Sequence, residues 1–398
     1  MYLNCHTYYS LRYGTFPIRE LCELAYSNDI WQFAITDINN TSACLEFLRL
    51  TNGTKIKPVL GIDFRNAAEQ QYIGLAKNNA GFLQLNDHLS NHLHEKKDFE
   101  TVAPQLPDCF IIYPFGKVVE QKRKNFRSNE YIGVSKEEIG KLRFSEYRNL
   151  KDKLVILQTV SFRNKKDFNA HRLLRAIDNN LLLSKLPETE QGKASHKMYP
   201  KREMEVAFED FPHILENTQQ IMDACKVHYD FGKGQNRNLK VYRNTIEEDA
   251  DMIRRLTYEK LPKKYPNANR AVYTRVEKEL ESIIRLEFVS YFLINLGIVD
   301  YARSQNYPFV GRGSGANSIV AYILGITNVD PIELDLYFER FINPNRKSPP
   351  DFDLDFSWKD RNDITDYIFG TYKNTALMGT YVTFKQRAVA RELGKVFG

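Results

Sequence analysis

The chain has 398 residues, which is enough for two or three domains with cores of their own. Hydrophobic residues make up 42% and charged residues 27%, a composition that excludes a disordered chain. The net charge of +6 is too small to establish a polyanionic partner. No uninterrupted apolar stretch reaches about 20 residues, and no signal-peptide pattern opens the chain. The five cysteines form no C-x-x-C pair, so we expect reduced thiols and a cytoplasmic protein.

Short β-like runs and helical segments alternate over residues 1 to about 180. Segment 17–29 has apolar residues at helical spacing, which predicts a helix. Alternation of this kind predicts an α/β unit with parallel strands, open or closed into a barrel. The expected strands are 2–10, 33–37, 57–64, 72–76, 109–115 and 154–160.

The character of the sequence changes near residue 229. Before that point, 187–201 is predicted to be a loop, and a helix through 204–226 is expected to break at Pro212. The polar stretch 230–245 is rich in Gly and Asn and marks a domain boundary. Charged and apolar helical patterns follow. The sequence stops inside such a pattern at Gly398, which suggests part of a longer protein.

The strongest functional signal is PPDFDLDF at 349–356, where acidic and apolar residues alternate. On a strand this period places Asp351, Asp353 and Asp355 on one face, about 7 Å apart in successive steps. Three adjacent negative charges favour divalent cations with oxygen ligands, and Mg²⁺ fits best. Paired carboxylates of this kind support two-metal phosphoryl transfer. The alternative is an edge strand with a solvated acidic face.

A glycine-rich turn, FVGRGSGANS at 309–318, stands shortly before the aspartates. Gly311, Gly313 and Gly315 allow close approach of the main chain to a ligand. Good N-cap residues follow, so we expect the next helix to present free N–H groups to an anion, with Arg312 adding a phosphate-binding charge. Alone this pattern is more often a plain tight turn. Beside a carboxylate strand it predicts a triphosphate site.

Residues 291–356 resemble the palm of the bacterial DNA polymerase III alpha family. The resemblance rests on the combination of GRGSGA, an IT..DP step, FERF.NP and PDxDxDF. Weaker similarity to the family's N-terminal PHP domain lies in AITD, IKPVLGIDF and LAKNNAGFLQL. The chain departs from the family where Val-Gly replaces the usual Pro-Gly before Arg312, and where Asn317 replaces a usual Gly.

The resemblance implies an α/β fold in which a distorted (β/α) barrel-like PHP domain precedes an α+β nucleotidyltransferase-type palm. It places a degenerate PHP domain at 1–228, the palm at 229–384 and the start of the thumb at 385–398. It also implies that a third catalytic aspartate follows residue 398, so that the fragment is not a competent polymerase. The implied site residues are Asp351 and Asp353 as catalytic magnesium ligands, Asp355 as possible support, and Arg312, Gly313, Ser314 and Arg340 as nucleotide contacts.

Most ligands of an active PHP metal cluster are replaced. Asn4, Ile38 and Phe162 stand where the family has ligands, while His6, Asp37 and Asp63 remain. These remnants are too few and too scattered for a cluster. We expect apolar residues to close the old site and no metal in 1–228, which leaves a scaffold and, by resemblance, a docking surface for a proofreading exonuclease subunit.

Other charged segments have ordinary explanations. The stretch His92-Leu93-His94-Glu95 is expected to be a solvated helix face rather than a metal site, because i and i+2 point to different sides. The basic run 121–127 is also expected to be solvated. At the C-terminus a basic stripe recurs every four residues, either solvated or, in the thumb position, facing duplex phosphates. It consists of Arg387, Arg391 and Lys395.

The leading interpretation is a fragment of a DNA-directed DNA polymerase of bacterial cytoplasm, associated with the nucleoid. It implies template–primer DNA, deoxynucleoside triphosphates and Mg²⁺ as ligands of the palm, and a sliding clamp as a partner of regions past residue 398. Two alternatives remain. One is a PHP-type metal-dependent phosphoesterase, which the lost ligands oppose, and the other is a non-enzymatic module that docks DNA or polymerase partners.

Overall fold

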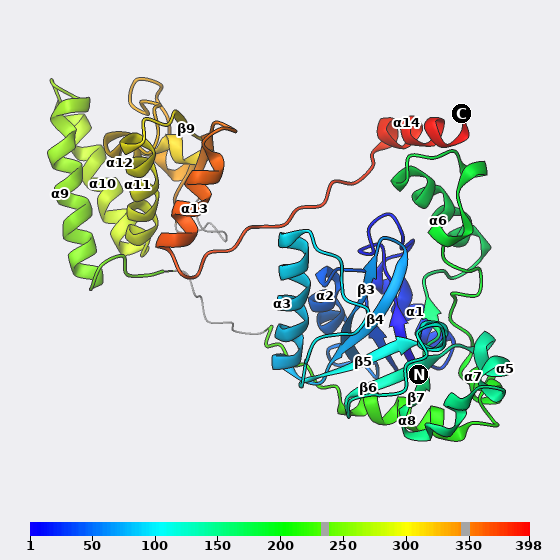
Figure 1. Cartoon of the computed structure of the whole chain (residues 1–398). Helices are drawn as coiled ribbons and strands as arrows, with labels where there is room; N and C mark the ends of the chain where they lie inside the picture. Colours follow the sequence, from blue (N-terminus) through cyan, green and yellow to red (C-terminus); the bar gives the residue numbers. More distant parts are fainter. Residues whose placement is uncertain (232–238, 344–350) are drawn as a thin grey trace. The chain divides into compact units, whose positions relative to one another are not determined.

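The computed structural model describes residues 1–231, 239–343 and 351–398 of the chain (Figure 1). The chain divides into two compact units. Unit 1 comprises Met1–Gly234 together with Val382–Gly398, and unit 2 comprises Gln235–Tyr381.

A single large sheet organises unit 1. Its strands are β1 Tyr2–Cys5, β2 Gln32–Ile35, β3 Lys57–Asn66, β4 Glu69–Ala76, β5 Cys109–Pro114, β6 Glu130–Val134, β7 Leu154–Ile156 and β8 Thr159–Val160. Their order in the sheet is β7-β6-β5-β4-β3-β2-β1-β8. Strands β7 and β8 therefore lie at opposite edges, although only residues 157 and 158 separate them. Three Cα–Cα steps span at most about 11 Å, so the sheet must curl into a half-barrel, which confirms the predicted barrel-like fold.

The sequence analysis expected parallel strands, but the sheet is mixed. β3 pairs with β4 and β4 with β5 in antiparallel fashion, whereas the other neighbours are parallel. Only residues 67 and 68 join β3 to β4, with Ala67 at a φ of 51°. A connection this short permits a hairpin but no crossover. The run predicted as one strand at 154–160 is two strands, and β6 was not predicted.

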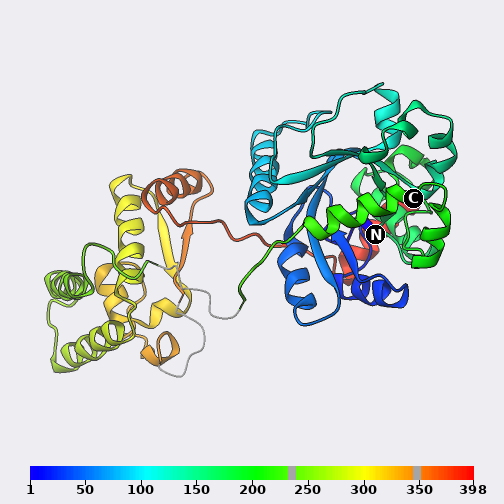
Figure 2. The same ribbon diagram turned by 90° about the horizontal axis from the view of Figure 1, so that it is seen from below.

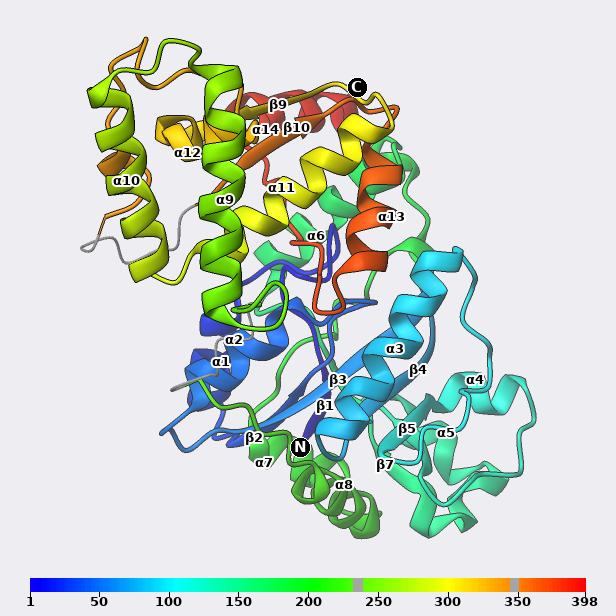
Figure 3. The same ribbon diagram turned by 90° about the vertical axis from the view of Figure 1, so that its left-hand side faces the viewer.

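Unit 1 also contains α-helices, several of which pack on the two faces of the half-barrel. They are α1 Ile18–Ser27, α2 Ser42–Thr51, α3 Asn79–Glu95, α4 Phe115–Glu120, α5 Ile139–Arg143, α6 Lys165–Asp178, α7 Lys201–Ala207, α8 Pro212–Ala224 and α14 Gln386–Phe397. α3 lies along β3 and β4 (Figure 3). Its N-terminus is capped by the Asn78 side chain, which accepts a hydrogen bond from the Gly81 amide. Pro212 opens α8 as the first residue, so the predicted break between α7 and α8 is confirmed.

Strands of unit 1 bury side chains on both faces, which explains their nearly continuous apolar runs. Tyr2 and Phe33 belong to the larger cluster beneath the helices, while Leu3 and Ala34 pack with Met222 of α8 on the other face. All five cysteines are free thiols, and all except the half-buried Cys22 are buried.

The C-terminal helix packs on α6 inside unit 1 (Figure 1). Its apolar residues Leu393 and Val396 contact Ala176 and Ile177 of α6 and Leu183. The helix is amphipathic, so this contact covers its apolar stripe and leaves the charged stripe outward.

Unit 2 is a helical assembly around a two-stranded sheet. It consists of α9 Ile246–Lys264, α10 Arg270–Arg285, α11 Val289–Ser304, α12 Ile319–Leu324, α13 Arg361–Thr371, and the strands β9 Phe309–Arg312 and β10 Asp353–Phe356. The two strands run side by side as the yellow and orange arrows of Figure 2. The apolar core lies between α9, α10, α11 and α12, which agrees with the expected mixed α and β palm-type region.

Among the described residues, no single helix is long and apolar enough to cross a bilayer. α10 and α11 reach the required length and composition only when they are taken together, and the chain bends by 111° between them.

Candidate active site

An antiparallel strand pair brings the aspartate motif beside the glycine-rich turn. β10 pairs with β9 so that Asp353 lies opposite Arg312 and Asp355 lies opposite Val310. β9 runs directly into a 3₁₀ turn, Gly313–Asn317, which leads to α12. The two motifs that were expected to form one centre are therefore neighbours in unit 2.

Side chains alternate along β10 as its sequence predicts. Leu354 and Phe356 pack into apolar clusters, whereas the Asp353 and Asp355 side chains are 42% and 55% exposed. Asp351 is also exposed, but it lies just before the strand begins. The strand itself thus carries two of the three expected carboxylates.

Polar side chains of the turn bind these carboxylates directly. Arg312 Nε donates to Asp355 Oδ2 at 2.5 Å, and its NH1 lies 3.5 Å from Asp353 Oδ2. This contact with Asp355 raises the pKa of Arg312. Ser314 Oγ donates to Asp351 Oδ1 at 2.9 Å. One guanidinium and one hydroxyl therefore hold the acidic face together.

At two positions of the turn, only glycine fits. Gly313 has a φ of +77°, and a Cβ atom there would lie 2.3 Å from Asp353 Oδ2. A Cβ atom at Gly311 would lie 2.1 Å from the Ile326 carbonyl oxygen. Both positions need glycine for conformation or space, and at Gly313 the Asp353 carboxylate packs directly against the main chain.

The N-terminus of α12 is not free to bind an anion, contrary to the expectation from its N-cap residues. The Ser318 hydroxyl accepts a hydrogen bond from the Ala321 amide, and Glu279 Oε2 accepts one from the Val320 amide at 3.3 Å. Glu279 is fully buried. A carboxylate of the protein thus occupies the positive end of this helix.

Arg275 and Glu279 on α10 form a support that the sequence analysis missed. Arg275 Nε donates to Glu279 Oε1 at 2.6 Å, and its NH2 donates to the carbonyl oxygens of Asn317 at 3.1 Å and Leu336 at 3.0 Å. Glu279 also accepts from Ser318 Oγ at 2.8 Å. The i, i+4 spacing of Arg275 and Glu279 was a visible signal for their pairing, but nothing local pointed to the turn.

The carboxylates fit a hard divalent cation. Mg²⁺ prefers oxygen ligands and keeps several water ligands, and Asp351, Asp353 and Asp355 offer oxygens at an exposed position. Asp355 is already engaged by Arg312, so Asp351 and Asp353 are the better candidate ligands.

The remaining predicted contacts lie in two places. Arg340 is the exposed last residue of the 3₁₀ turn Phe338–Arg340, which contacts the glycine-rich turn. The basic stripe Arg387, Arg391 and Lys395 lies on α14 in unit 1. Arg391 and Lys395 both form ion pairs with Glu392 on the same helix.

The histidine and aspartate remnants of the PHP domain are less scattered than expected. His6 Nε2 donates to Asp63 Oδ2 at 3.0 Å, and Ser161 Oγ hydrogen-bonds His6 Nδ1 at 2.8 Å. Asn4 Nδ2 lies 3.4 Å from the same Asp63 oxygen. Asp37 binds separately, with donors from Thr7 and Ser10.

A buried guanidinium lies beside these remnants. Arg65 donates to Asp63 Oδ2 from Nε at 3.0 Å and from NH2 at 2.7 Å, and both side chains are buried. Burial alone would raise the pKa of Asp63, but Arg65 and His6 hold it at about 2. The expectation that apolar residues close the old site was therefore wrong in part, because the Arg65 guanidinium lies there. Asp63 and Arg65 stand two residues apart on β3, a spacing that places them on one face.

The basic run at 121–127 is also more than a solvated surface. Arg123 NH2 donates to the buried Glu130 at 2.8 Å, and the Arg123 guanidinium lies 4.1 Å from the centre of the Tyr113 ring. Arg127 donates to the carbonyl oxygens of Pro104 and Ala103. Two of its cations thus stabilise the end of the sheet.

Comparisons with known proteins match two regions of the chain. Residues 251–398 match the bacterial DNA polymerase III alpha NTPase domain, and residues 3–119 match the PHP domain. The whole chain is similar to proteins named DNA polymerase III subunit alpha, with 29% identity in Ureaplasma parvum, 30% in Buchnera aphidicola subsp. Acyrthosiphon pisum and 27% in Escherichia coli K12. It spans 39%, 38% and 38% of these relatives' lengths, respectively. The chain therefore contains a PHP domain followed by a region of the bacterial DNA polymerase III alpha NTPase domain.

Proposed function

We propose that the chain supplies part of the nucleotidyl-transfer centre of a template-directed DNA polymerase. In this reaction a primer 3′-hydroxyl attacks the α-phosphate of a deoxynucleoside triphosphate, and pyrophosphate leaves. The observation that carries the proposal is the pairing of β9 with β10, which sets Arg312 opposite Asp353 at an exposed turn.

Each residue of the turn has a distinct role in this proposal. Asp351 and Asp353 hold Mg²⁺, and Ser314 orients the Asp351 carboxylate through its 2.9 Å hydrogen bond. When bound, Mg²⁺ would lower the pKa of the attacking hydroxyl and neutralise charge on the triphosphate. Arg312 binds phosphate oxygens, and Gly313 lets the main chain approach them. Asp355 keeps the Arg312 guanidinium at the site until the nucleotide arrives.

Contacts with DNA and other proteins are proposed from the family alone. Arg340 is a further phosphate contact, and the α14 stripe faces template–primer DNA. The relatives' names describe an alpha subunit of a larger polymerase, and we extend to this chain a proofreading exonuclease subunit and a sliding clamp as partners. Because a third catalytic aspartate is expected past Gly398, the 398-residue chain alone should not extend a primer.

Unit 1 is proposed to act as a scaffold rather than as a phosphoesterase. A metal at the Asp63 carboxylate would meet the buried Arg65 guanidinium, which already binds Oδ2 twice. Like charges at this distance repel strongly in a buried site. The place where Asn4, His6 and Asp63 meet, called the barrel mouth below, is therefore proposed to hold no metal.

The test is primer extension by a polymerase that carries this chain. Asp353→Asn should lower extension at least about a hundredfold while DNA binding stays nearly intact, because two-metal chemistry tolerates little displacement. Asp366→Asn is the control, since it changes an exposed aspartate of α13 in the same unit, away from the turn. Extension by Asp353→Asn within about tenfold of the wild type would contradict the proposal.

A further inference from the structure

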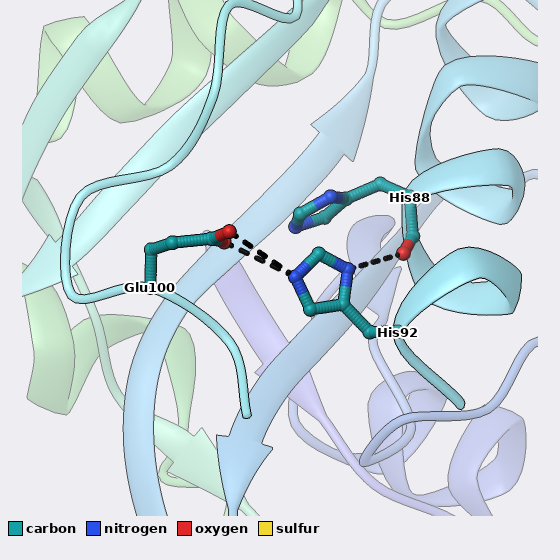
Figure 4. Close-up of side chains that lie close together, drawn as sticks. All are labelled: His88, His92 and Glu100. Atoms are coloured by element: carbon teal, nitrogen blue, oxygen red, sulfur yellow. Dashed lines mark hydrogen bonds and ion pairs between the residues drawn. The ribbon is translucent and has the colours of Figure 1, made fainter. Parts of the chain in front are cut away.

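A three-ligand cluster lies at the C-terminal end of α3, apart from both sites described above. His88 and His92 stand four residues apart on α3, which places them on one face of the helix. Glu100 comes from the segment after the helix. One potential ligand atom from each of the three lies within 4.8 Å of the other two. In Figure 4 the Glu100 carboxylate points toward the ring of His92, and His88 lies beside both.

His92 is oriented like a metal ligand. Its Nδ1 lies 2.9 Å from the His88 carbonyl oxygen, which can only accept, so Nδ1 carries the hydrogen. Nε2 then faces the Glu100 carboxylate, at 3.3 Å from Oε1 and 3.2 Å from Oε2. Two lone-pair donors at this separation need a cation between them, either a proton or a metal ion. Donation of the other ring N–H to a backbone carbonyl is the usual arrangement of a metal-bound histidine.

His88 lies in apolar surroundings on the inner side of the cluster. Its ring packs against Phe64 and Phe99, with ring centres 5.1 and 5.6 Å away. Burial, with the neighbouring His92, lowers the pKa of His88 to about 4, which keeps the imidazole neutral. Tyr72 hydrogen-bonds its Nε2 at 2.7 Å and is the competitor for this nitrogen.

The segment that carries Glu100 is anchored before any ligand arrives. The Phe99 amide donates to Asn66 Oδ1 at 2.8 Å, and Asn66 Nδ2 donates to the Phe99 carbonyl at 2.8 Å. These two hydrogen bonds fix Phe99, the residue before Glu100, to the end of β3. The Phe99 ring also stacks on His92, with ring centres 4.7 Å apart.

We propose that His88, His92 and Glu100 bind a divalent transition-metal ion of the zinc class. Two imidazoles and one carboxylate are a common zinc donor set, and histidines at i and i+4 on one helix face are a frequent way to supply the imidazoles. Glu100 is largely exposed, so water can complete the coordination. The ion would join the end of α3 to the segment that Asn66 anchors.

This site differs from the metal histidines considered in the sequence. His94 and Glu95 are exposed, as expected of a solvated face, but His92 turns toward His88 instead. The expectation of no metal in 1–228 was drawn from lost barrel-mouth ligands. For the Asp63 site it remains a proposal, and it does not extend to α3.

The experiment is a titration of the purified 398-residue chain, stripped of metal, with Zn²⁺ by calorimetry and with Co²⁺ by visible absorption. We expect one equivalent to bind, with the absorption of cobalt bound to nitrogen and oxygen. His92→Ala and Glu100→Gln should each weaken binding at least about tenfold. His94→Ala, on the same helix, and His6→Ala, at the barrel mouth, should leave it unchanged. Tyr72→Phe should keep or strengthen binding because it removes the competitor.

Three results would overturn the proposal. One is the absence of stoichiometric binding in the wild type, which would mean that a proton alone bridges His92 and Glu100. Another is binding that His92→Ala and Glu100→Gln leave intact. The third is binding that only His6→Ala abolishes, which would place the metal at the barrel mouth instead. Circular dichroism of each variant, compared with that of His94→Ala, separates loss of ligands from loss of folding.

Discussion

Arg65 donates two hydrogen bonds to the Oδ2 atom of Asp63, at 3.0 and 2.7 Å, where both side chains are buried. Asn4 and His6 contact the same oxygen. The Arg65 guanidinium thus neutralises the carboxylate of Asp63. By its resemblance to PHP domains, the sequence analysis had assigned Asp63 to the remnants of a metal cluster. The stability of unit 1 should therefore depend on the buried positive charge of Arg65.

Arg65→Ala should therefore destabilise unit 1 by about 3 to 5 kcal/mol, because it leaves a buried carboxylate without its cation. The free energy of unfolding can be measured by hydrogen exchange of the strand amides of unit 1 across a urea series. Arg12→Ala is the control. It breaks an ion pair with Asp178 whose side chains are 50% and 36% exposed, and it should cost about 1 kcal/mol or less. Equal costs for the two variants would contradict a buried charge pair.

His171 should make unit 1 less stable at mildly acidic pH. Its Nδ1 donates to the Tyr13 carbonyl and its Nε2 accepts from the Gly192 amide, both at 2.8 Å. Burial, reinforced by the charge of Arg175, lowers the pKa of His171 to about 4. An unfolded histidine has a pKa of about 6.5, so between these values the unfolded state binds more protons.

The stabilisation from neutral His171 is therefore complete above about pH 6.5 and is lost as the pH falls toward 4, by roughly 3 kcal/mol in all. Unfolding free energies between about pH 7.5 and 4.5 should decline less steeply in His171→Gln than in the wild type. Identical slopes would show that another group carries the dependence.

The support beneath the glycine-rich turn can be tested through Glu279. This buried carboxylate accepts from Arg275, Ser318 and the Val320 amide. Glu279→Gln should destabilise unit 2 by about 2 kcal/mol or more, because the charge-assisted bonds are weakened. Glu339→Gln removes an exposed pair with Lys278 and should cost about 1 kcal/mol or less. Hydrogen exchange of α12 amides is the measurement, and protection unchanged by Glu279→Gln would remove the assigned role.

Arg312→Ala should raise the KM for deoxynucleotide, lower kcat, or both, in a polymerase that carries this chain. The loss of a charge-assisted phosphate contact corresponds to roughly tenfold or more in kcat/KM. Arg312→Lys should recover only part, because an ammonium group lacks the guanidinium fork. Steady-state extension kinetics provide the measurement. Unchanged kinetics in Arg312→Ala would mean that the turn is structural only.

Local patterns predicted much of this fold, and distant contacts did not follow from them. Proline geometry located the break at Pro212, and period-two alternation placed Leu354 and Phe356 in the core. The β3–β4 hairpin was missed because its connection at 67 and 68 is Ala-Ala, which lacks the usual glycine or asparagine signal.

The sites show the same limit. Glu279 and Ser318 meet across 39 residues, and only the packing of α10 beside α12 brings them together. In contrast, Asp63 and Arg65 on one strand face, and His88 and His92 on one helix face, were readable from spacing. Spacing alone gives a shared face for each pair, but not the distant partner, Glu100 for His92 or His6 for Asp63, that completes each cluster.

Manganese binding by the chain tests the central claim most directly, namely that Asp351 and Asp353 hold the divalent cations of nucleotidyl transfer. Electron paramagnetic resonance of Mn²⁺, titrated with a deoxynucleoside triphosphate present, reports the bound ion. His92→Ala serves as the background, so that the α3 cluster does not contribute. Asp351→Asn and Asp353→Asn should each weaken binding at least about tenfold, while Asp355→Asn stays within about threefold of that background. Manganese held as tightly by Asp353→Asn, or lost equally in Asp355→Asn, would contradict the account.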